Sequence, residues 1–116
     1  MKNLKVIKIE NDEIEFENGV KLYSRLKSDY YDYHYLCMDA LTIEDFEELR
    51  FDLTNDNFFK RIDAYGIELI PVRGYSVKIP AYGLIGYYSE QVNLILTDDK
   101  EFKKEYDITE CQVVKY

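Results

Sequence analysis

The feature that most constrains the fold is a hairpin signal in the first 24 residues. Hydrophobic residues alternate with glutamates from Glu13 to Glu17, which is the period of a strand with one buried face. Asn18-Gly19 follows, and both residue types tolerate the positive φ of a tight type I′ turn. A Lys-punctuated strand over residues 6–9 precedes this segment, and apolar residues alternate again over 20–24. The sequence therefore predicts an N-terminal β-hairpin.

Two short helices are predicted in the middle of the chain. The first opens at residues 42–45, whose Thr-Ile-Glu-Asp sequence resembles a capping box. The second opens at Thr54 and ends near residues 65–66. Their apolar stripes are Phe46 and Leu49 in the first helix, and Phe58, Phe59 and Ile62 in the second.

The last 50 residues carry strand patterns. Strands are expected at 67–72, 76–79, 87–97 and 101–106, with a turn at Asp98-Asp99. Combined with the N-terminal hairpin, this pattern predicts an α+β fold. We expect a single small domain over residues 1–116, mostly antiparallel β-sheet with two short helices in the middle.

The charge of the chain is concentrated in residues 39–59. Seven carboxylates and one arginine there contribute −6 of the net charge of −8. The sequence pI near 4.6 argues against direct binding of nucleic acid and against docking on an anionic membrane. No signal peptide or spanning helix is evident, so we expect a cytoplasmic protein with Cys37 and Cys111 reduced.

The sequence holds no specific catalytic motif, and no cofactor or metal is predicted. His34, the one histidine, lies near Asp29 and Asp32 and could act with them as an acid/base or ligand group. A lone histidine between tyrosines is more typical of a structural residue. The segment from Asp52 begins like a calcium loop, but it lacks the glycine and the bidentate glutamate that such a loop requires, so helix capping explains it better.

A partner-binding surface is predicted from the acidic block and the tyrosines before it. Tyrosine supplies rigid, amphipathic contact area and is enriched at interface hot spots. The predicted partner-binding residues are Glu44, Asp45, Glu47, Glu48, Asp52, Tyr30, Tyr31 and Tyr33. The competing interpretation is structural: the tyrosines replace Trp and Phe in a small core, and the acids form a solvated face.

Two alternative functions stay open. In the first, a bend over residues 82–88 and Arg73 form a pocket for a nucleotide-like ligand. Its binding residues would be Arg73, Tyr82, Tyr87 and Tyr88. In the second, the chain is a degenerate metal-site enzyme that uses His34, Asp29 and Asp32.

Six segments of the sequence carry a resemblance to a known protein family. They are residues 13–19, 51–56, 65–71, 79–83, 86–89 and 106–112, including Ile-Pro-Ala-Tyr-Gly, Gly-Tyr-Tyr-Ser and Tyr-Asp-Ile-Thr-Glu-Cys-Gln. Together they resemble a family of small phage- and prophage-associated proteins over nearly the whole chain. That family typically carries a His, Asp, two Cys, Glu and His cluster that would suit a metal. Here Leu26 stands at the first His, Tyr30-Tyr31 at the two Cys, and Leu84-Ile85 at two family Asn positions. With these exchanges, the resemblance implies binding rather than catalysis.

The combined hypothesis is a non-enzymatic acidic binding protein of phage or prophage type. We expect it to inhibit a host protein that handles nucleic acid or serves in defence, as an anti-CRISPR protein does. Its carboxylates would occupy a basic groove meant for phosphates. The expected state is a monomer or a homodimer.

Overall fold

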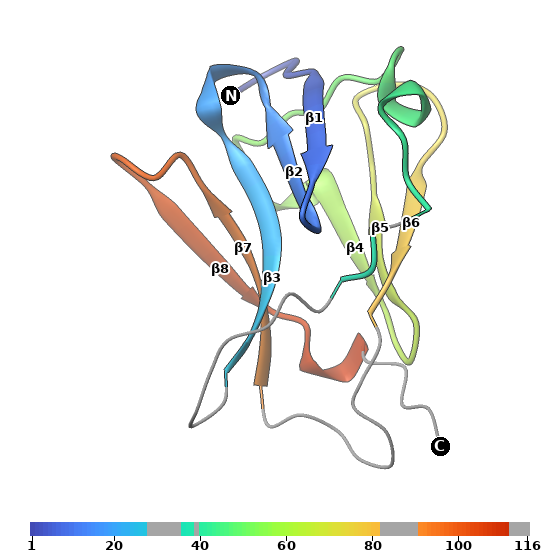
Figure 1. Cartoon of the computed structure of the whole chain (residues 1–116), viewed down its shortest axis with the longest axis vertical. Helices are drawn as coiled ribbons and strands as arrows, with labels where there is room; N and C mark the ends of the chain where they lie inside the picture. The colour runs from blue at the N-terminus through green and yellow to red at the C-terminus, as the bar shows by residue number, and fades with distance from the viewer. Residues whose placement is uncertain (28–35, 39, 82–90, 112–116) are drawn as a thin grey trace.

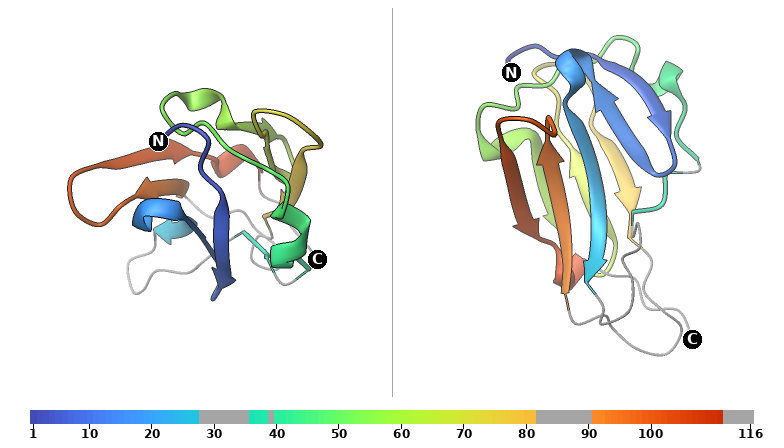
Figure 2. Two further views of the ribbon diagram at one scale, coloured as in Figure 1. Left: turned by 90° about the horizontal axis from the view of Figure 1, so that it is seen from above. Right: turned by 60° about the vertical axis from the view of Figure 1, so that its left-hand side comes forward.

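The computed structural model describes residues 1–27, 36–38, 40–81 and 91–111 (Figure 1). Its strands form two antiparallel sheets, of order β1-β2-β3-β7-β8 and β4-β5-β6. The larger sheet contains β1 (Val6–Glu10), β2 (Glu13–Phe16), β3 (Lys21–Lys27), β7 (Gln91–Thr97) and β8 (Lys103–Asp107). The smaller sheet contains β4 (Phe59–Ile62), β5 (Gly66–Leu69) and β6 (Val77–Pro80). In the right-hand view of Figure 2 the larger sheet lies in front of the smaller one.

The predicted N-terminal hairpin is a three-stranded meander of β1, β2 and β3. Residues 11 and 12, with φ of 54° and 57°, make the first turn. Asn18 and Gly19 also have positive φ, 68° and 75°, as predicted. Their connection is the three-residue 3₁₀ turn η1 (Glu17–Gly19) rather than a two-residue type I′ turn. The turn chemistry was therefore correct and the loop length was wrong.

The predicted α+β fold with two short helices is wrong, because the described residues form antiparallel sheets joined by short 3₁₀ turns and contain no α-helix. The first is η2 (Ile43–Phe46), a single turn. The Asp45 carboxylate accepts the backbone N–H of Thr42 at 2.8 Å, so the predicted local contact forms. A single turn fixes several residues for one backbone hydrogen bond, so it does not compensate for the entropy lost when an α-helix nucleates. Phe46 and Leu49 are instead drawn into the core, at 0% and 1% exposure.

The second predicted helix is a 3₁₀ turn followed by a strand. Asn55, not Thr54, caps η3 (Asp56–Phe58) by accepting the N–H of Asn57 at 2.8 Å. The chain then enters β4, where Phe59 pairs with Leu69 of β5. The cross-strand ladder of this β4–β5 hairpin satisfies the backbone there, so strand pairing replaces the predicted helix.

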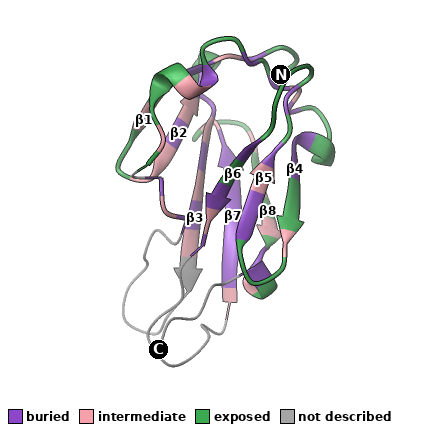
Figure 3. Ribbon diagram, turned by 90° about the vertical axis from the view of Figure 1, so that its right-hand side faces the viewer, coloured by how far each residue is buried: buried purple, intermediate pink, exposed green. Residues whose placement is uncertain are grey.

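The core lies between the two sheets. Inward-facing residues alternate along the strands; they include Ile14, Phe16, Leu22, Ile67, Leu69, Ile79, Val92, Leu94 and Leu96. In Figure 3 the buried residues follow β5, β6 and β7, and exposed residues lie mostly in connections and on the edge strands.

The two open sides of the sandwich are closed differently. On one side, Tyr106 of β8 packs edge-on against Phe58 and Phe59, with ring centroids 5.8 and 5.0 Å apart. On the other, residues 43–53 run beside β1, and Leu4 and Phe51 exchange two backbone hydrogen bonds of 2.9 Å. This segment covers the free edge of β1, which would otherwise be open to pairing with another chain.

Candidate functional site

The segment that covers the β1 edge turns its carboxylates to solvent. Phe46 and Leu49 are buried, whereas Glu44, Glu47 and Glu48 are exposed and Asp45 is half-buried. We call Glu44, Asp45, Glu47 and Glu48 the acidic face. Side chains three residues apart eclipse in a 3₁₀ turn, so Glu44 and Glu47 project on the same side. The sequence predicted these four residues as partner-binding, and the structure brings them together.

The acidic face is poor in compensating charge. Among the described residues, Glu44, Glu47 and Glu48 form no ion pair. Elsewhere, lysines pair with Glu10, Glu13 and Glu105 at 2.7, 3.6 and 3.9 Å. The carboxylates of Glu44, Glu47 and Glu48 therefore differ from those of Glu10, Glu13 and Glu105, each of which has a lysine partner.

The loop between β5 and β6, residues 70–76, packs against the acidic face. We call it the Tyr75 loop; it lies beside η2 at the top right of Figure 1. The Tyr75 hydroxyl donates to the carbonyl of Asp45 at 2.8 Å, and the Val72 N–H donates to the carbonyl of Arg50 at 2.8 Å. Tyr75 and Val72 are nevertheless 59% and 58% exposed. The loop thus presents anchored apolar side chains to solvent next to carboxylates.

Two arginines complete this end of the molecule. Arg73 lies in the Tyr75 loop and Arg50 follows the acidic face, and both are exposed. Neither forms an ion pair within the part of the chain that the structure describes. This end of the molecule therefore carries two positive groups beside the acidic face.

Asp52, the fifth predicted acidic residue, follows the acidic face by four residues and is half-buried. Its Oδ1 atom accepts the Thr54 hydroxyl at 2.5 Å and the Thr54 N–H at 3.0 Å. The hydroxyl bond is the main cause that lowers the pKa of this carboxyl, followed by the N–H bond. Asp52 borders a depression of about 220 Å³, together with Asn55, Asn57, Phe58, Ile70, Pro71 and Val72.

Several predicted site residues lie outside the described part of the chain. These are Tyr30, Tyr31 and Tyr33 of the partner surface, Tyr82, Tyr87 and Tyr88 of the ligand pocket, and Asp29, Asp32 and His34 of the metal alternative. Arg73 is the one predicted pocket residue that is described. In residues 1–27, 36–38, 40–81 and 91–111, no group of three or more His, Cys, Asp or Glu side chains is arranged to hold a metal.

Tyr75 is the functional candidate that sequence reasoning missed. The predicted surface consists of clustered tyrosines, whereas Tyr75 stands alone after Gly74 in a loop. A large apolar residue in a Pro- and Gly-punctuated loop is a signal of exposure that could have identified it. Gly74 is required there, because its φ is 101° and a Cβ would approach Leu49 Cδ2 to 3.1 Å.

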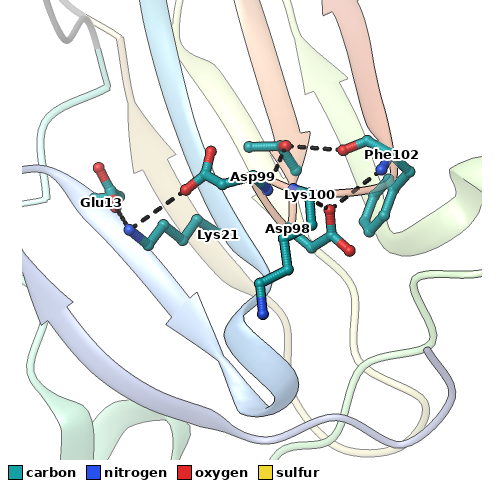
Figure 4. A network of polar contacts seen from close by, with 7 residues as sticks. Glu13, Lys21, Asp98, Asp99, Lys100 and Phe102 are labelled. Carbon is teal, nitrogen blue, oxygen red and sulfur yellow. Dashed lines mark hydrogen bonds and ion pairs between the residues drawn. The ribbon is translucent and has the colours of Figure 1, made fainter.

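The outer face of the larger sheet offers a contrast, because its charges are paired. Lys21 Nζ lies 3.6 Å from carboxylate oxygens of both Glu13 and Asp99 (Figure 4). In the same network, Asp98 accepts backbone N–H groups of the β7–β8 turn, from Lys100, Glu101 and Phe102, at 2.9 to 3.2 Å. This network holds a turn in place and leaves little charge uncompensated.

A second depression, of about 450 Å³, lies at the end of β8 beside η4 (Thr109–Cys111) and is lined by Arg61 and residues 107–111. Cys111 is buried there, and burial raises the pKa of its thiol. Cys37 is half-buried, and no disulfide joins these two described cysteines. The raised pKa makes Cys111 a poor nucleophile at neutral pH.

Comparison of the chain with protein-family models, with curated proteins and with solved structures gave no match. The resemblance to phage- and prophage-associated proteins therefore remains a prediction from the sequence phrases. In the part of the chain that the structure describes, no helix has the length and hydrophobicity needed to cross a bilayer.

Proposed function

We propose that the protein is a non-enzymatic binding protein whose acidic face and Tyr75 loop contact a basic surface of another protein. One observation carries this proposal: Tyr75 is 59% exposed while its hydroxyl is fixed to the backbone of Asp45. An aromatic ring held at the surface among carboxylates costs little entropy to bury against a partner. Such rings are enriched at interface hot spots.

The unpaired carboxylates favour a cationic partner. Glu44, Glu47 and Glu48 have no ion pair to break among the described residues, so a basic partner gains attraction without displacing a lysine. Charges of this kind raise the association rate and select the partner, whereas the apolar residues supply most of the affinity. Val72 and Tyr75 are suited to the second role.

The partner class that we propose is a host protein that handles nucleic acid, including a defence nuclease. Such proteins carry grooves of Lys and Arg that bind phosphates. Glu44 and Glu47 are separated by three residues of a 3₁₀ turn, which corresponds to about 6 Å of rise. Phosphates repeat at about 3.4 Å along the axis of one DNA strand, so the carboxylates imitate their charge and only approximately their spacing. Support for the phage setting comes from the sequence resemblance alone.

Capture of proteins from a bacterial lysate at low and high salt tests the proposal. The variant carries Glu44→Lys, Glu47→Lys and Glu48→Lys. The matched control carries Asp63→Lys, Glu101→Lys and Glu110→Lys, three exposed carboxylates elsewhere with the same change in net charge. We expect a host protein to be captured at low salt by the native chain and the control, and lost with the first variant. Equal capture by both variants would show that the acidic face is not the binding surface.

A further inference from the structure

We infer that the depression between Asp52 and the Tyr75 loop receives a lysine or arginine side chain of the partner. The inference rests on the proposed function and names a subsite of the same surface. Asp52 was expected from the sequence to join the acidic face. The structure places it on the rim of an apolar hollow.

The depression has an apolar interior and a polar rim. Phe58 and Pro71 are buried beneath it, and Ile70 and Val72 are 38% and 58% exposed at its wall. Asp52, Asn55 and Asn57 supply the polar side. Its volume of about 220 Å³ corresponds to roughly seven water molecules at ~30 Å³ each, which is room for one long side chain.

The chemistry of the rim favours a side chain with an aliphatic stem and a cationic end. Lysine and arginine lay their methylene groups along apolar surface and keep the charge in a polar setting. Oδ1 of Asp52 is occupied by Thr54, which also fixes the orientation of the carboxylate. Oδ2 accepts no hydrogen bond from a described residue, so it can accept one from a guanidinium or ammonium group.

The depression and the acidic face belong to one contact area. Val72 lines the depression, and its N–H is bonded to the carbonyl of Arg50, two residues after Glu48. A partner segment that covers Tyr75 therefore reaches Val72 and the depression without leaving the loop. Lys2 acts on Asp52 electrostatically, so it is a cation that competes with the partner for this carboxylate.

The test is an NMR titration of the full-length protein with a capped octapeptide of alternating arginine and alanine. The matched probe replaces each arginine by citrulline, which is nearly isosteric and neutral. We expect the arginine peptide to shift the side-chain amides of Asn55 and Asn57 and the backbone amide of Val72, and the citrulline peptide to leave them unchanged. Asp52→Asn should weaken binding about threefold, the range of a partly exposed ion pair. Lys2→Gln should strengthen it.

Asp107→Asn is the control for the turn. Oδ1 of Asp107 accepts the Thr109 hydroxyl at 2.5 Å and the Thr109 N–H at 2.9 Å, almost the same arrangement as at Asp52. We expect Asp107→Asn to bind the arginine peptide with unchanged affinity, which would show that removing the charge of a carboxylate in such a turn does not by itself weaken binding. Shifts confined to residues 44–48, no shifts at all, or equal shifts with citrulline would each overturn the inference. The capture experiment with the lysine variants decides the proposed function separately.

Discussion

The hydroxyl of Tyr75 donates to the backbone carbonyl of Asp45 at 2.8 Å, across 30 positions of the chain. This bond joins the loop of the smaller sheet to the segment that covers the edge of the larger one. It uses the backbone of Asp45 and leaves the exposed glutamates on either side unengaged. The same hydrogen bond thus connects two parts of the fold and holds the Tyr75 ring in the position in which we propose that the ring contacts a partner.

Substitutions of Tyr75 should separate these two roles. Tyr75→Phe removes one exposed hydrogen bond, so we expect a loss of about 1 kcal/mol or less in the free energy of unfolding, measured in urea. Partner capture should weaken only slightly because the ring remains. Tyr75→Ala should abolish capture while the chain stays folded. Full capture by Tyr75→Ala would remove this residue from the binding surface.

Gly66 should be the least replaceable glycine among the described residues. Its φ is 155°, and a Cβ there would lie 2.0 Å from the carbonyl oxygen of Ile79 and 2.9 Å from the amide nitrogen of Ala81. Both are backbone atoms of the β5–β6 pairing and cannot move without breaking it. We expect Gly66→Ala to cost more than about 3 kcal/mol or to prevent folding.

Gly19→Ala is the matched control for that substitution. Gly19 has a φ of 75°, but nothing lies within 4 Å of a Cβ at this position. Only backbone strain applies, so we expect a loss of about 1–2 kcal/mol. Urea unfolding of both variants measures the difference. Similar losses at the two positions would contradict the close packing at Gly66.

Stability should fall in acid through the aspartates that hold turns. Hydrogen bonds from the Lys100, Phe102 and Glu101 N–H groups lower the pKa of Asp98. A carboxyl whose pKa is lower in the folded state stabilises it above the unfolded pKa of about 3.9, and this contribution is lost as pH falls through the folded value. Urea midpoints should therefore drop below about pH 4. Asp98→Asn should flatten that drop, because the amide oxygen still accepts the bonds and does not titrate.

Tyr106 should make the protein sensitive to alkali. Partial burial, followed by its 2.7 Å hydrogen bond to the Asp56 carboxylate, raises the pKa of this phenol. A raised folded pKa gives stability that is complete below the unfolded value of about 10 and is lost as pH rises through the folded value. We expect the midpoint of unfolding to fall above about pH 10. Tyr106→Phe should reduce that fall and keep the contacts with Phe58 and Phe59.

Local signals predicted a large part of this structure. The strands expected at 67–72, 76–79 and 101–106 correspond to β5, β6 and β8, because alternation and turn residues report a half-buried strand directly. The exposure of Glu44, Glu47 and Glu48 was also predictable, since charged side chains are rarely buried without partners. The capping contact between Asp45 and Thr42 formed as expected from a three-residue spacing.

Strand pairing and the packing of the two sheets, which local sequence patterns do not report, decided the absence of the helices and the composition of the proposed binding surface. Residues 43–62 contain helical spacings, but Phe51 pairs with Leu4 and β4 pairs with β5. Leu4 is distant from Phe51 in sequence, whereas β5 follows β4 in a tight hairpin, and both pairings outweigh a weak local preference for helix. By contrast, alternation and turn residues are local signals, so the sequence alone determined that this chain forms antiparallel strands and carries solvent-facing acids. Only the tertiary structure decided that Tyr75 stands beside those acids and that Asp52 borders a depression with Ile70 and Val72, because a contact between distant loops depends on how the two sheets pack.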